Sequence, residues 1–498
     1  MRKFGYILLL FFFGNLANAQ TGITFEVQDV LNKEELSEHL RYLASDELQG
    51  RRTASPGGQK AAEYIAAQFK AIGLLPAPGM DGYFQHIPFV RVKPAQSGEI
   101  ELEETRYLVG DNFVQIRGGQ AGIQAEAVFV GQGWVDEEQG YNDYEGLDVE
   151  GKVVIALPGT PDDTQPFQAF RATKQKREIA REKGALAIVE LYRLRMPWRF
   201  VKRFLNSDRL EVGKASEYTD DLIHIWLKEN EDAQLELKRG DVLPISLSTD
   251  GLKVDSTEAV NVVGFIPGAD DSLKNEILLL TAHYDHVGVG KQGGGAYTEA
   301  DSIFNGARDN AIGVVSLIAA AKELMARPPA RTVAFVAFTG EEMGLLGSKY
   351  YADNPVFPLE QTVYNLNNDG AGYNSTAHYS MIGWGRTNAD TLFVEAAKAT
   401  GLEISKNPAE NQNLFERSDN ISFAQKGIPA VTFSPGFLEM DQEIMKYYHQ
   451  VTDNPDTLDY DYLFKFWKAY ARAAELLANT PMKLWWTPGD KFEPGNDE

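Results

Sequence analysis

Five short polar motifs in this chain carry side chains of the types that bind metal ions and transfer protons. They are His283-Tyr284-Asp285-His286, Asp309-Asn310, Glu341-Glu342, Asp369-Gly370 and Tyr448-His449. Imidazole nitrogens and carboxylate oxygens together are typical ligands of zinc and similar divalent ions. One of two adjacent glutamates could bind a metal while its neighbour accepts a proton from water. The motifs therefore indicate a candidate metal centre.

Each motif alone also has an ordinary structural explanation. In chain order these are a polar turn at a strand end, a helix N-cap, acidic residues at a helix N-terminus, a turn before glycine and an isolated structural histidine. His286 could also compete with His283 as a ligand. Their joint occurrence, each after a predicted strand or at a helix entrance, favours chemistry over five separate coincidences.

The elements that must position these motifs alternate between strand and helix in the second half of the chain. The predicted strands, apolar and buried on both faces, are Val262–Ile266, Ile277–Leu280, Thr332–Phe338, Val363–Leu366 and Ala430–Phe433. The predicted helices are Ala311–Met325, Thr391–Ala399 and Tyr462–Leu477. This alternation predicts an α/β domain with a largely parallel sheet and helices on both faces. Such sheets place functional residues in the loops at the carboxyl ends of their strands.

Two other regions have patterns of their own. Residues 33–75 have helical periodicity, with a glycine-rich loop at Gly50–Gly58 between two helices. Residues 100–245 predict an inserted β-rich module. Its expected elements are the strands Ala125–Val130, Val153–Leu157 and Ala185–Leu191 and the helix Thr173–Lys183.

The first residues have the pattern of a signal peptide. Arg2 and Lys3 precede the apolar run Ile7–Phe13, and Ala17-Asn18-Ala19 offers a small-x-small cleavage site. The run is much shorter than the ~20 residues that cross a bilayer. We therefore expect residues 1–19 to be removed and the mature protein to be exported, periplasmic or secreted, without a stable membrane anchor. The alternative is an uncleaved apolar N-terminus.

Composition excludes several other classes of function. Acidic residues outnumber basic ones by 71 to 48, a net charge of −23, which disfavours nucleic-acid binding. The chain has no cysteine, so thiol nucleophiles and cysteine-ligated metals are excluded. With seven histidines in 498 residues, a metal site must rely largely on carboxylates.

The five motifs resemble those of the co-catalytic zinc aminopeptidases of metallopeptidase family 28 (clan MH). Residues 33–75 and 250–478 resemble the catalytic domain. The segments Val128–Gly131, Asp143–Leu147 and Gly151–Val154 are similar to the protease-associated (PA) insert of many members. The resemblance implies a three-layer α/β/α catalytic domain with a mostly parallel central sheet, interrupted by the insert. The expected boundaries are 1–19 for the signal peptide, 20–99 and 246–480 for the catalytic domain, 100–245 for the insert and 481–498 for a C-terminal tail.

The resemblance also implies a role for each motif residue. Two divalent metal ions, zinc in the first place, would be held by His283, Asp309, Glu342, Asp369 and His449. Asp309 would bridge the ions, with Glu342 and His449 on one and His283 and Asp369 on the other. Glu341 would be the general base, and Asp285 the carboxylate behind His283. A cis peptide bond is implied at Asp309-Asn310.

The implied function is an exported metallopeptidase with peptide substrates. A hydroxide bridging the two metals would attack the peptide bond with Glu341 as base, and an aminopeptidase releasing N-terminal residues is favoured. The alternatives are a single-zinc acyltransferase similar to glutaminyl cyclase, a carboxypeptidase or dipeptidase of the same clan, and a binding module on this scaffold like the transferrin receptor. The preferred side chain and the oligomeric state stay open.

Two segments stand apart from these patterns. Many relatives have Ser-Asp-His where this chain has Ser418-Asp419-Asn420, which could alter substrate contacts but not the ligand set. The insert contains a basic, aromatic segment over residues 192–204 in an otherwise acidic chain. We expect it to pack and form ion pairs against the acidic catalytic domain; the alternatives are a lid over the substrate cleft and a membrane-surface contact.

Overall fold

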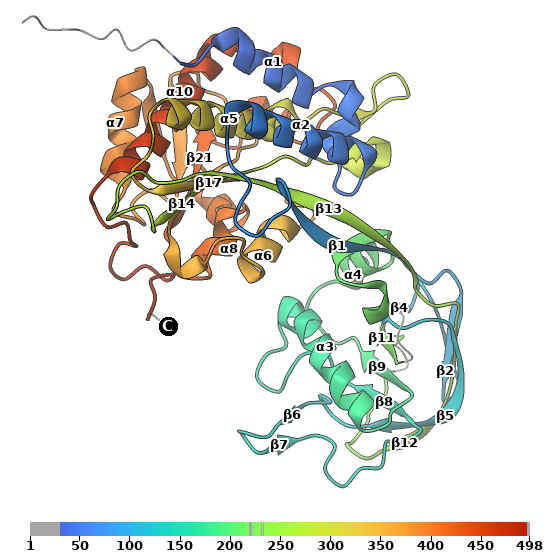
Figure 1. The fold of residues 1–498 in the computed structure, drawn as a ribbon. Helices are drawn as coiled ribbons and strands as arrows, with labels where there is room; N and C mark the ends of the chain where they lie inside the picture. Colours follow the sequence, from blue (N-terminus) through green and yellow to red (C-terminus); the bar gives the residue numbers. More distant parts are fainter. Residues whose placement is uncertain (1–29, 219–221, 231, 233, 496–498) are drawn as a thin grey trace, which may run out of the picture.

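A computed structural model arranges the chain as two lobes (Figure 1). It describes residues 30–218, 222–230, 232 and 234–495. The upper lobe is built on a nine-stranded sheet and the lower lobe on an eight-stranded sheet. The predicted signal peptide, residues 1–19, lies outside the described residues. Among those residues, none of the helices is both long and apolar enough to cross a membrane.

The upper sheet has the strand order β10-β1-β13-β17-β14-β18-β21-β19-β20. Its strands are β1 (Phe84–Lys93), β10 (Arg209–Val212), β13 (Lys253–Ile266), β14 (Ile277–His283), β17 (Thr332–Phe338), β18 (Thr362–Asn368), β19 (His378–Ile382), β20 (Glu403–Lys406) and β21 (Ala430–Pro435). At its centre, β17, β14, β18 and β21 pair in parallel. These four strands contain four of the five buried apolar segments predicted from the sequence, and the fifth, Val262–Ile266, lies in β13.

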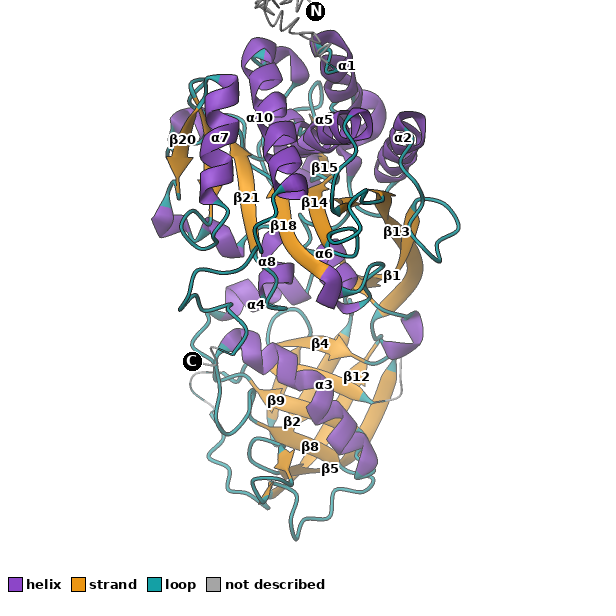
Figure 2. Cartoon of the chain, turned by 60° about the vertical axis from the view of Figure 1, so that its left-hand side comes forward, coloured by secondary structure: helices purple, strands orange, loops and turns teal. Residues whose placement is uncertain are grey.

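Helices cover both faces of this sheet, which confirms the three-layer α/β/α class (Figures 1 and 2). One face carries α1 (Lys33–Leu43), α2 (Pro56–Ile72), α5 (Ile312–Ala326), α7 (Asp390–Thr400) and α10 (Tyr460–Asn479). The other face carries α6 (Leu346–Asp353) and α8 (Asn420–Ala424). Helix α5 is apolar on nearly every side because it packs between the sheet and its neighbouring helices α1, α2 and α10.

The sheet is more mixed than the prediction of a mostly parallel sheet. Strand β13 is antiparallel to both of its neighbours, β1 and β17. Strand β1 is also antiparallel to β10, and β19 is antiparallel to β21. The reason lies in the chain path: β1 leads out of the upper lobe toward the lower one and β13 returns, so the two strands pair as an antiparallel ribbon. Strand β10, within the residues expected to form the insert, also returns to pair with β1.

The lower lobe has its own sheet and its own core. Its strands are β2 (Gly98–Leu102), β3 (Thr105–Leu108), β4 (Phe113–Arg117), β5 (Ala121–Phe129), β8 (Val153–Ala156), β9 (Ala187–Leu191), β11 (Ile223–Leu227) and β12 (Val242–Thr249). Figure 2 shows α3 (Pro166–Glu182) lying across this sheet. Phe113, Ile155 and Val189 are buried in a cluster made entirely of lower-lobe residues. A β-rich module thus interrupts the upper lobe, and its assignment as a PA domain stays a prediction.

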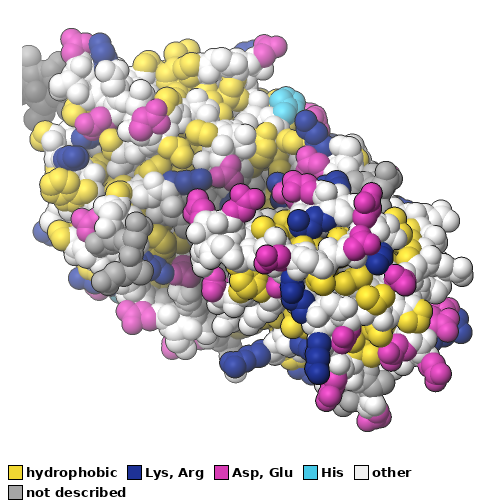
Figure 3. Space-filling view, turned by 90° about the horizontal axis from the view of Figure 1, so that it is seen from below, with side chains coloured by type: hydrophobic (Ala, Val, Ile, Leu, Met, Phe, Trp, Pro, Cys, Tyr) yellow, Lys and Arg dark blue, Asp and Glu magenta, His cyan; other side chains and the backbone are white. Residues whose placement is uncertain are grey.

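The basic, aromatic segment forms α4 (Trp198–Leu205), which packs on strand β4 of its own lobe. Val201 and Leu205 are buried against lower-lobe residues, and Lys202 lies 3.5 Å from the carboxylate of Asp111. Phe200 and Phe204 stay exposed. The expected ion pairing against the upper lobe is therefore wrong for Lys202, because Asp111 of the same lobe is within reach. Figure 3 shows acidic and basic side chains interspersed over the lower face of the molecule.

Candidate metal centre

The predicted site residues meet at the carboxyl edge of the central parallel strands. His283 ends β14, Glu341 follows β17, and Asp369 directly follows β18. Because β13 enters the sheet from the lower lobe and is antiparallel to β17, this edge faces the lower lobe. Two further residues come from connections: Asp309 from the irregular turn before α5, and His449 from the loop before α10.

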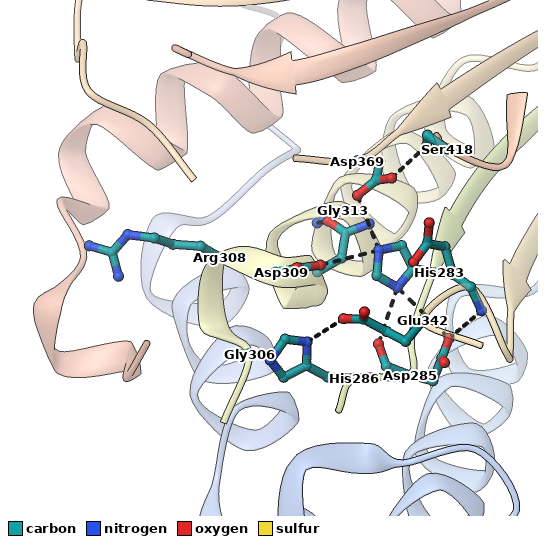
Figure 4. A network of polar contacts seen from close by, with 12 residues as sticks. His283, Asp285, His286, Gly306, Arg308, Asp309, Gly313, Glu342, Asp369 and Ser418 are labelled. Carbon is teal, nitrogen blue, oxygen red and sulfur yellow. Dashed lines mark hydrogen bonds and ion pairs between the residues drawn. The ribbon is translucent and has the colours of Figure 1, made fainter. Parts of the chain in front are cut away.

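Asp309 lies between two groups of possible ligands. Its Oδ1 is 3.3 Å from His283 Nε2, which is also 3.1 Å from Asp369 Oδ1. Its Oδ2 is 3.2 Å from His449 Nε2, which is also 3.1 Å from Glu342 Oε2. Figure 4 shows His283 between Asp369 and Asp309. The ligand atoms of each group lie within 4.8 Å of one another.

Bound divalent cations explain these short distances better than hydrogen bonds between the side chains do. An imidazole Nε2 carries at most one hydrogen, yet in His283 and in His449 this atom faces two carboxylate oxygens. A cation accepts all of these atoms as ligands at once. Oxygen and nitrogen donors without sulfur suit zinc, with cobalt or manganese as substitutes.

The electrostatics of the group agree with this chemistry. Burial would lower the pKa of His449, but its contacts with Asp309 and Glu342 raise that pKa to about 10. Burial would raise the pKa of Asp309, but hydrogen bonds from His283 and His449 hold it well below its ordinary value. Positive charge is thus stabilised at both imidazoles, where a metal ion would compete with the proton.

Glu341 is placed to exchange protons beside the ligands. It lines the same cavity as Asp309, Glu342, Asp369 and His449. Burial, opposed by His283 and reinforced by Asp369 and Glu342, raises the pKa of Glu341 well above its ordinary value. A carboxyl with a raised pKa can both take up and return a proton near neutral pH.

The Asp285 carboxylate contacts the backbone of the general-base candidate more closely than it contacts His283. Asp285 Oδ1 accepts a hydrogen bond from the Glu341 N–H at 3.1 Å, and Oδ2 accepts one from Thr53 Oγ1 at 2.8 Å. His283 Nδ1 lies 3.8 Å from Oδ1 but 3.1 Å from the Asp285 backbone carbonyl. Asp285 therefore links the turn after β14 to the one after β17.

Asn310 explains why Asp309 is available as a ligand. The sequence allowed Asp309 to cap the following helix, but it is Asn310 Oδ1 that accepts the Gly313 N–H, at 3.0 Å. Asn310 Nδ2 also donates to the Asn368 carbonyl at 2.8 Å. The peptide bond between Asp309 and Asn310 is cis, as the resemblance implies.

Several contacts around the site were not predicted from the sequence, although His286 was named there as a possible ligand. Ser418 Oγ donates to Asp369 Oδ2 at 2.5 Å, and His286 Nδ1 lies 2.7 Å from Glu342 Oε1. His286 therefore joins the Asp309–Glu342–His449 group instead of replacing His283. Asp453 accepts the backbone N–H groups of Arg308 at 2.9 Å and of Asp309 at 3.3 Å. No spacing signal points to these contacts, except that His286 belongs to the first motif.

A cavity opens beside the candidate ligands. Apart from those residues, its wall includes Ile382, Leu414, Arg417, Phe437, Met440 and Tyr448. Arg417 Nη2 lies 3.4 Å from the hydroxyl of Tyr448. Asn420, which replaces the common histidine, is buried behind this wall, where it donates to the Phe415 carbonyl and accepts from Thr432. Asn420 thus hydrogen-bonds to Thr432, which itself lines the cavity.

Comparison with known proteins is consistent with this geometry. Residues 261–474 match peptidase family M28. Aminopeptidase YwaD of Bacillus subtilis is 27% identical over 190 residues, 36% of this chain and 36% of that protein. A vacuolar membrane protease of Lachancea thermotolerans is 26% identical over 224 residues, 45% of this chain and 20% of that protein. The matched region thus spans well under half the length of these two relatives.

One solved structure shares the fold over nearly the whole chain. It is an aminopeptidase from Aneurinibacillus sp. strain AM-1, with a TM-score of 0.51 and 21% identity, covering 92% of this chain and 97% of that chain. The five candidate ligands all fall within the region that matches the family. The similarity to peptidase family M28 therefore covers the whole candidate metal centre.

Proposed function

We propose that the protein is a zinc-dependent metallo-exopeptidase, and specifically an aminopeptidase that releases N-terminal residues. The observation that carries the proposal is the position of Asp309, which turns one oxygen toward each of two ligand groups. A shared carboxylate between two groups favours a pair of metal ions over the single zinc of a glutaminyl cyclase-like enzyme. Each expected ligand position has a histidine or carboxylate side chain, which argues against a binding module that has lost its metal ligands.

The metal ions would be held by His283 and Asp369 on one side and by Glu342 and His449 on the other, with Asp309 between them. When bound, they would supply Lewis acidity that polarises the substrate carbonyl and acidifies the attacking water. His286, beside Glu342, would orient that ligand.

Glu341 would move the proton. It takes a proton from the water that attacks the peptide carbonyl carbon, and it then delivers this proton to the amine that leaves as the C–N bond breaks. Its backbone, fixed by Asp285, keeps the carboxylate beside the ligands. The cavity acids would also attract the protonated N-terminus of a peptide, which supports aminopeptidase action.

Arg417 in the cavity wall supports a second candidate within the same reaction class. A guanidinium can bind the terminal carboxylate of a substrate, as a dipeptidase or carboxypeptidase would require. The two candidates differ in which end of the peptide must be free.

The remaining parts of the proposal concern the chain outside the centre. We assign residues 20–99 and 246–480 to the catalytic domain, 100–245 to a PA insert and 481–498 to a C-terminal tail. Export after removal of residues 1–19 is part of the same proposal. The separate cores of the two lobes support the division.

Metal analysis combined with a set of blocked peptides tests the function. We expect two zinc ions per chain, and cleavage of unblocked and C-amidated peptides but not of N-acetylated ones. Cleavage of N-acetylated peptides with a free carboxylate would instead identify a carboxypeptidase. One ion per chain together with cyclisation of N-terminal glutamine would overturn the peptidase assignment.

A further inference from the structure

The segment after α10 contacts residues that neighbour the wall of the candidate substrate cavity. We define residues 485–494 as the C-terminal strap; they follow the last helix and lie outside the region that matches the family. The strap is joined to the loop after β19 by backbone contacts, since Thr487 N–H donates to the Arg386 carbonyl at 2.7 Å and Trp486 bridges to Thr387. Trp486 is buried, and its Nε1 donates to the Gly427 carbonyl at 3.0 Å.

Arg386 connects the strap to the cavity wall. Its guanidinium donates two hydrogen bonds to Asp490, at 2.7 and 2.8 Å, and it stacks over the Phe415 ring at 3.9 Å. Phe415 is also stacked by Phe492 of the strap, with ring centroids 5.9 Å apart and planes 22° apart. A bidentate pair of this kind specifies the orientation of the guanidinium as well as its distance. Because Phe415 packs between Arg386 and Phe492, the strap helps to hold the Phe415 ring in place.

Two residues that contact the strap lie between two residues that line the cavity. Phe415 packs on Phe492, and Glu416 forms an ion pair with Lys491. On either side of them, Leu414 and Arg417 line the cavity next to the candidate ligands. Because these four residues are consecutive, a shift of the strap-facing pair must move the cavity-facing pair.

This wall also reaches the metal centre. Arg417 contacts the hydroxyl of Tyr448, the residue before the ligand His449, and the next residue, Ser418, donates to the ligand Asp369. The strap thus holds one end of a segment whose other end contacts the metal centre. Because Ser418 has its own anchor at Asp369, loss of the strap should disturb the wall at Leu414 more than the ligands.

We infer that the C-terminal strap is a specificity-determining element: through the Arg386–Asp490 pair and Phe492 it positions Leu414 and Arg417, the wall against which the substrate's side chain packs. The inference rests on the proposed aminopeptidase function. Arg386, Asp490 and Phe492 are positioning residues, since they contact the wall and not the substrate. A strap that only seals the apolar core would affect stability alone.

Kinetics of Asp490→Ala with two chromogenic substrates tests the inference. For L-leucine p-nitroanilide, we expect KM to rise about tenfold with kcat changed less than about twofold, the size expected for loss of a charge-assisted bidentate contact that acts only on binding. For L-alanine p-nitroanilide, whose small side chain needs less of the wall, KM should change less than about twofold. Asp490→Glu, which keeps the carboxylate, should restore most of the leucine KM.

A matched control removes a similar ion pair away from the cavity. Arg472 joins α10 to α7 through Glu395 at 2.7 Å, so Arg472→Ala should leave both KM values unchanged. Equal changes in Arg472→Ala and Asp490→Ala would reduce the strap to a general stabilising role and overturn the inference. So would unchanged kinetics of a folded Asp490→Ala protein.

A measurement without substrate separates this inference from the proposed function. Amide hydrogen exchange of residues 410–418 should be faster in Asp490→Ala than in the unaltered protein and in Arg472→Ala. Unchanged exchange would refute the positioning role whatever the activity. If the unaltered protein cleaves neither substrate, the aminopeptidase proposal fails, while the exchange data still decide whether the strap holds the wall.

Discussion

Glu341 and Glu342 are adjacent in sequence but have different surroundings. The Glu342 carboxylate contacts His286 and His449, whereas Glu341 is held through its backbone N–H, which donates to the Asp285 carboxylate. The Glu341 carboxylate thus stays available for a proton. At this scale, a difference in contacts separates the proposed metal ligand from the proposed base.

The substitution Glu341→Gln tests this separation. We expect turnover to fall by about 10²–10⁴-fold because the amide cannot accept the proton of the attacking water. Zinc content, measured by atomic absorption, should stay at the unaltered level, since Glu341 is not among the proposed ligands. Activity above a tenth of the original, or loss of zinc, would contradict its role.

Asp453 is a second residue-scale case, because it holds the backbone that carries Asp309. It also forms a buried ion pair with Arg308 at 3.0 Å. Asp453→Asn should weaken zinc binding about 10–100-fold, as expected for partners of metal ligands, and it should destabilise the protein by about 3–5 kcal/mol because Arg308 is left without its counter-charge. Zinc titration and chemical denaturation measure the two effects.

A matched variant provides the comparison for Asp453. Asp461 pairs with Lys33 at 2.7 Å on the surface, with 84% of the Asp461 side chain exposed. Asp461→Asn should change stability by at most about 1 kcal/mol and leave zinc affinity unaltered. A similar loss of affinity in both variants would show that Asp453 has no specific role.

The candidate site residues that could be predicted are those that follow a regular apolar pattern in the sequence. The predicted ligands that follow a strand could be recognised in the sequence because each comes after an apolar run that ends at a polar turn. The run Thr332–Phe338, for example, has the bounds of β17. Thr53, Ser418 and Asp453 could not be recognised in this way, because each acts through a hydrogen bond to a residue far along the chain. Such contacts depend on tertiary packing, which leaves no periodic signal.

At the scale of elements, the glycine-rich segment Gly50–Gly58 is more than the loop that its composition predicts. Gly50 has φ +65°, and a Cβ there would lie 2.5 Å from the carbonyl oxygens of both Gly288 and Phe304. The next residue, Arg51, is buried and donates to the carbonyls of Tyr284 and Gly306. The connection between the first two helices is thus joined to the backbone near His283 and Asp309.

Gly50→Ala should therefore destabilise the protein more than its φ alone explains. Gly401 has a similar φ of +70°, but no atom lies within 4 Å of the place that a Cβ would take, so Gly401→Ala should cost only about 1–2 kcal/mol of left-handed strain. The additional clash with two backbone carbonyls should make Gly50→Ala clearly worse in the same thermal melt. Equal melting temperatures would show that the loops move aside freely.

Sheet topology was the least predictable element-scale feature. The central parallel strands were expected from their apolar runs, but the pairing of β1 with β10 and β13 was not. Strand β1 mixes exposed and buried positions, and the first part of β13 is largely exposed where it extends toward the lower lobe, so the partners of these strands depend on where the inserted module sits.

At the scale of the whole molecule, two cores are joined by the ribbon of β1 and β13 (Figure 1). A narrow connection predicts that the lobes unfold in separate transitions. Their stabilities should then respond to different conditions, because the candidate metal centre lies in one lobe and a different buried charge cluster lies in the other.

The lower-lobe transition should depend on pH through His224. This residue is buried in the lower lobe, 3.2 Å from Glu190, which also pairs with Lys176 at 2.7 Å. Burial, only partly opposed by Glu190, lowers the pKa of His224, so below its ordinary value of 6.5 the unfolded state binds the proton and the folded state does not. Stability should fall from pH 7 to pH 5 by at most about 1.4 kcal/mol per pH unit.

His224→Gln isolates this effect, because residues 98–249 contain no other histidine. The variant should lose the dependence between pH 7 and pH 5 whatever its absolute stability. A further loss should remain toward lower pH: burial would raise the pKa of Glu190, but Lys176 and His224 lower it to about 2, against an ordinary 4.5. An unchanged slope between pH 7 and pH 5 would exclude His224 as its source.

The upper-lobe transition should depend on metal. Around Asp309, the four carboxylates Asp309, Glu341, Glu342 and Asp369 outnumber the three imidazoles His283, His286 and His449, and bound cations would balance that charge in the folded state only. At 100 times the dissociation constant, a ligand specific for the folded state adds about 2.7 kcal/mol per site. Treatment with a chelator should therefore lower the upper-lobe melting temperature and leave the lower-lobe transition in place, and added zinc should reverse the change.

Calorimetry of the unaltered protein and of Asp309→Asn tests whether this metal dependence comes from the candidate centre. The upper lobe of the variant should melt at the temperature of the chelated protein and should not respond to zinc. If both transitions shifted together on chelation, either the lobes would unfold as one unit or zinc would bind outside this centre, and the response of Asp309→Asn would distinguish the two.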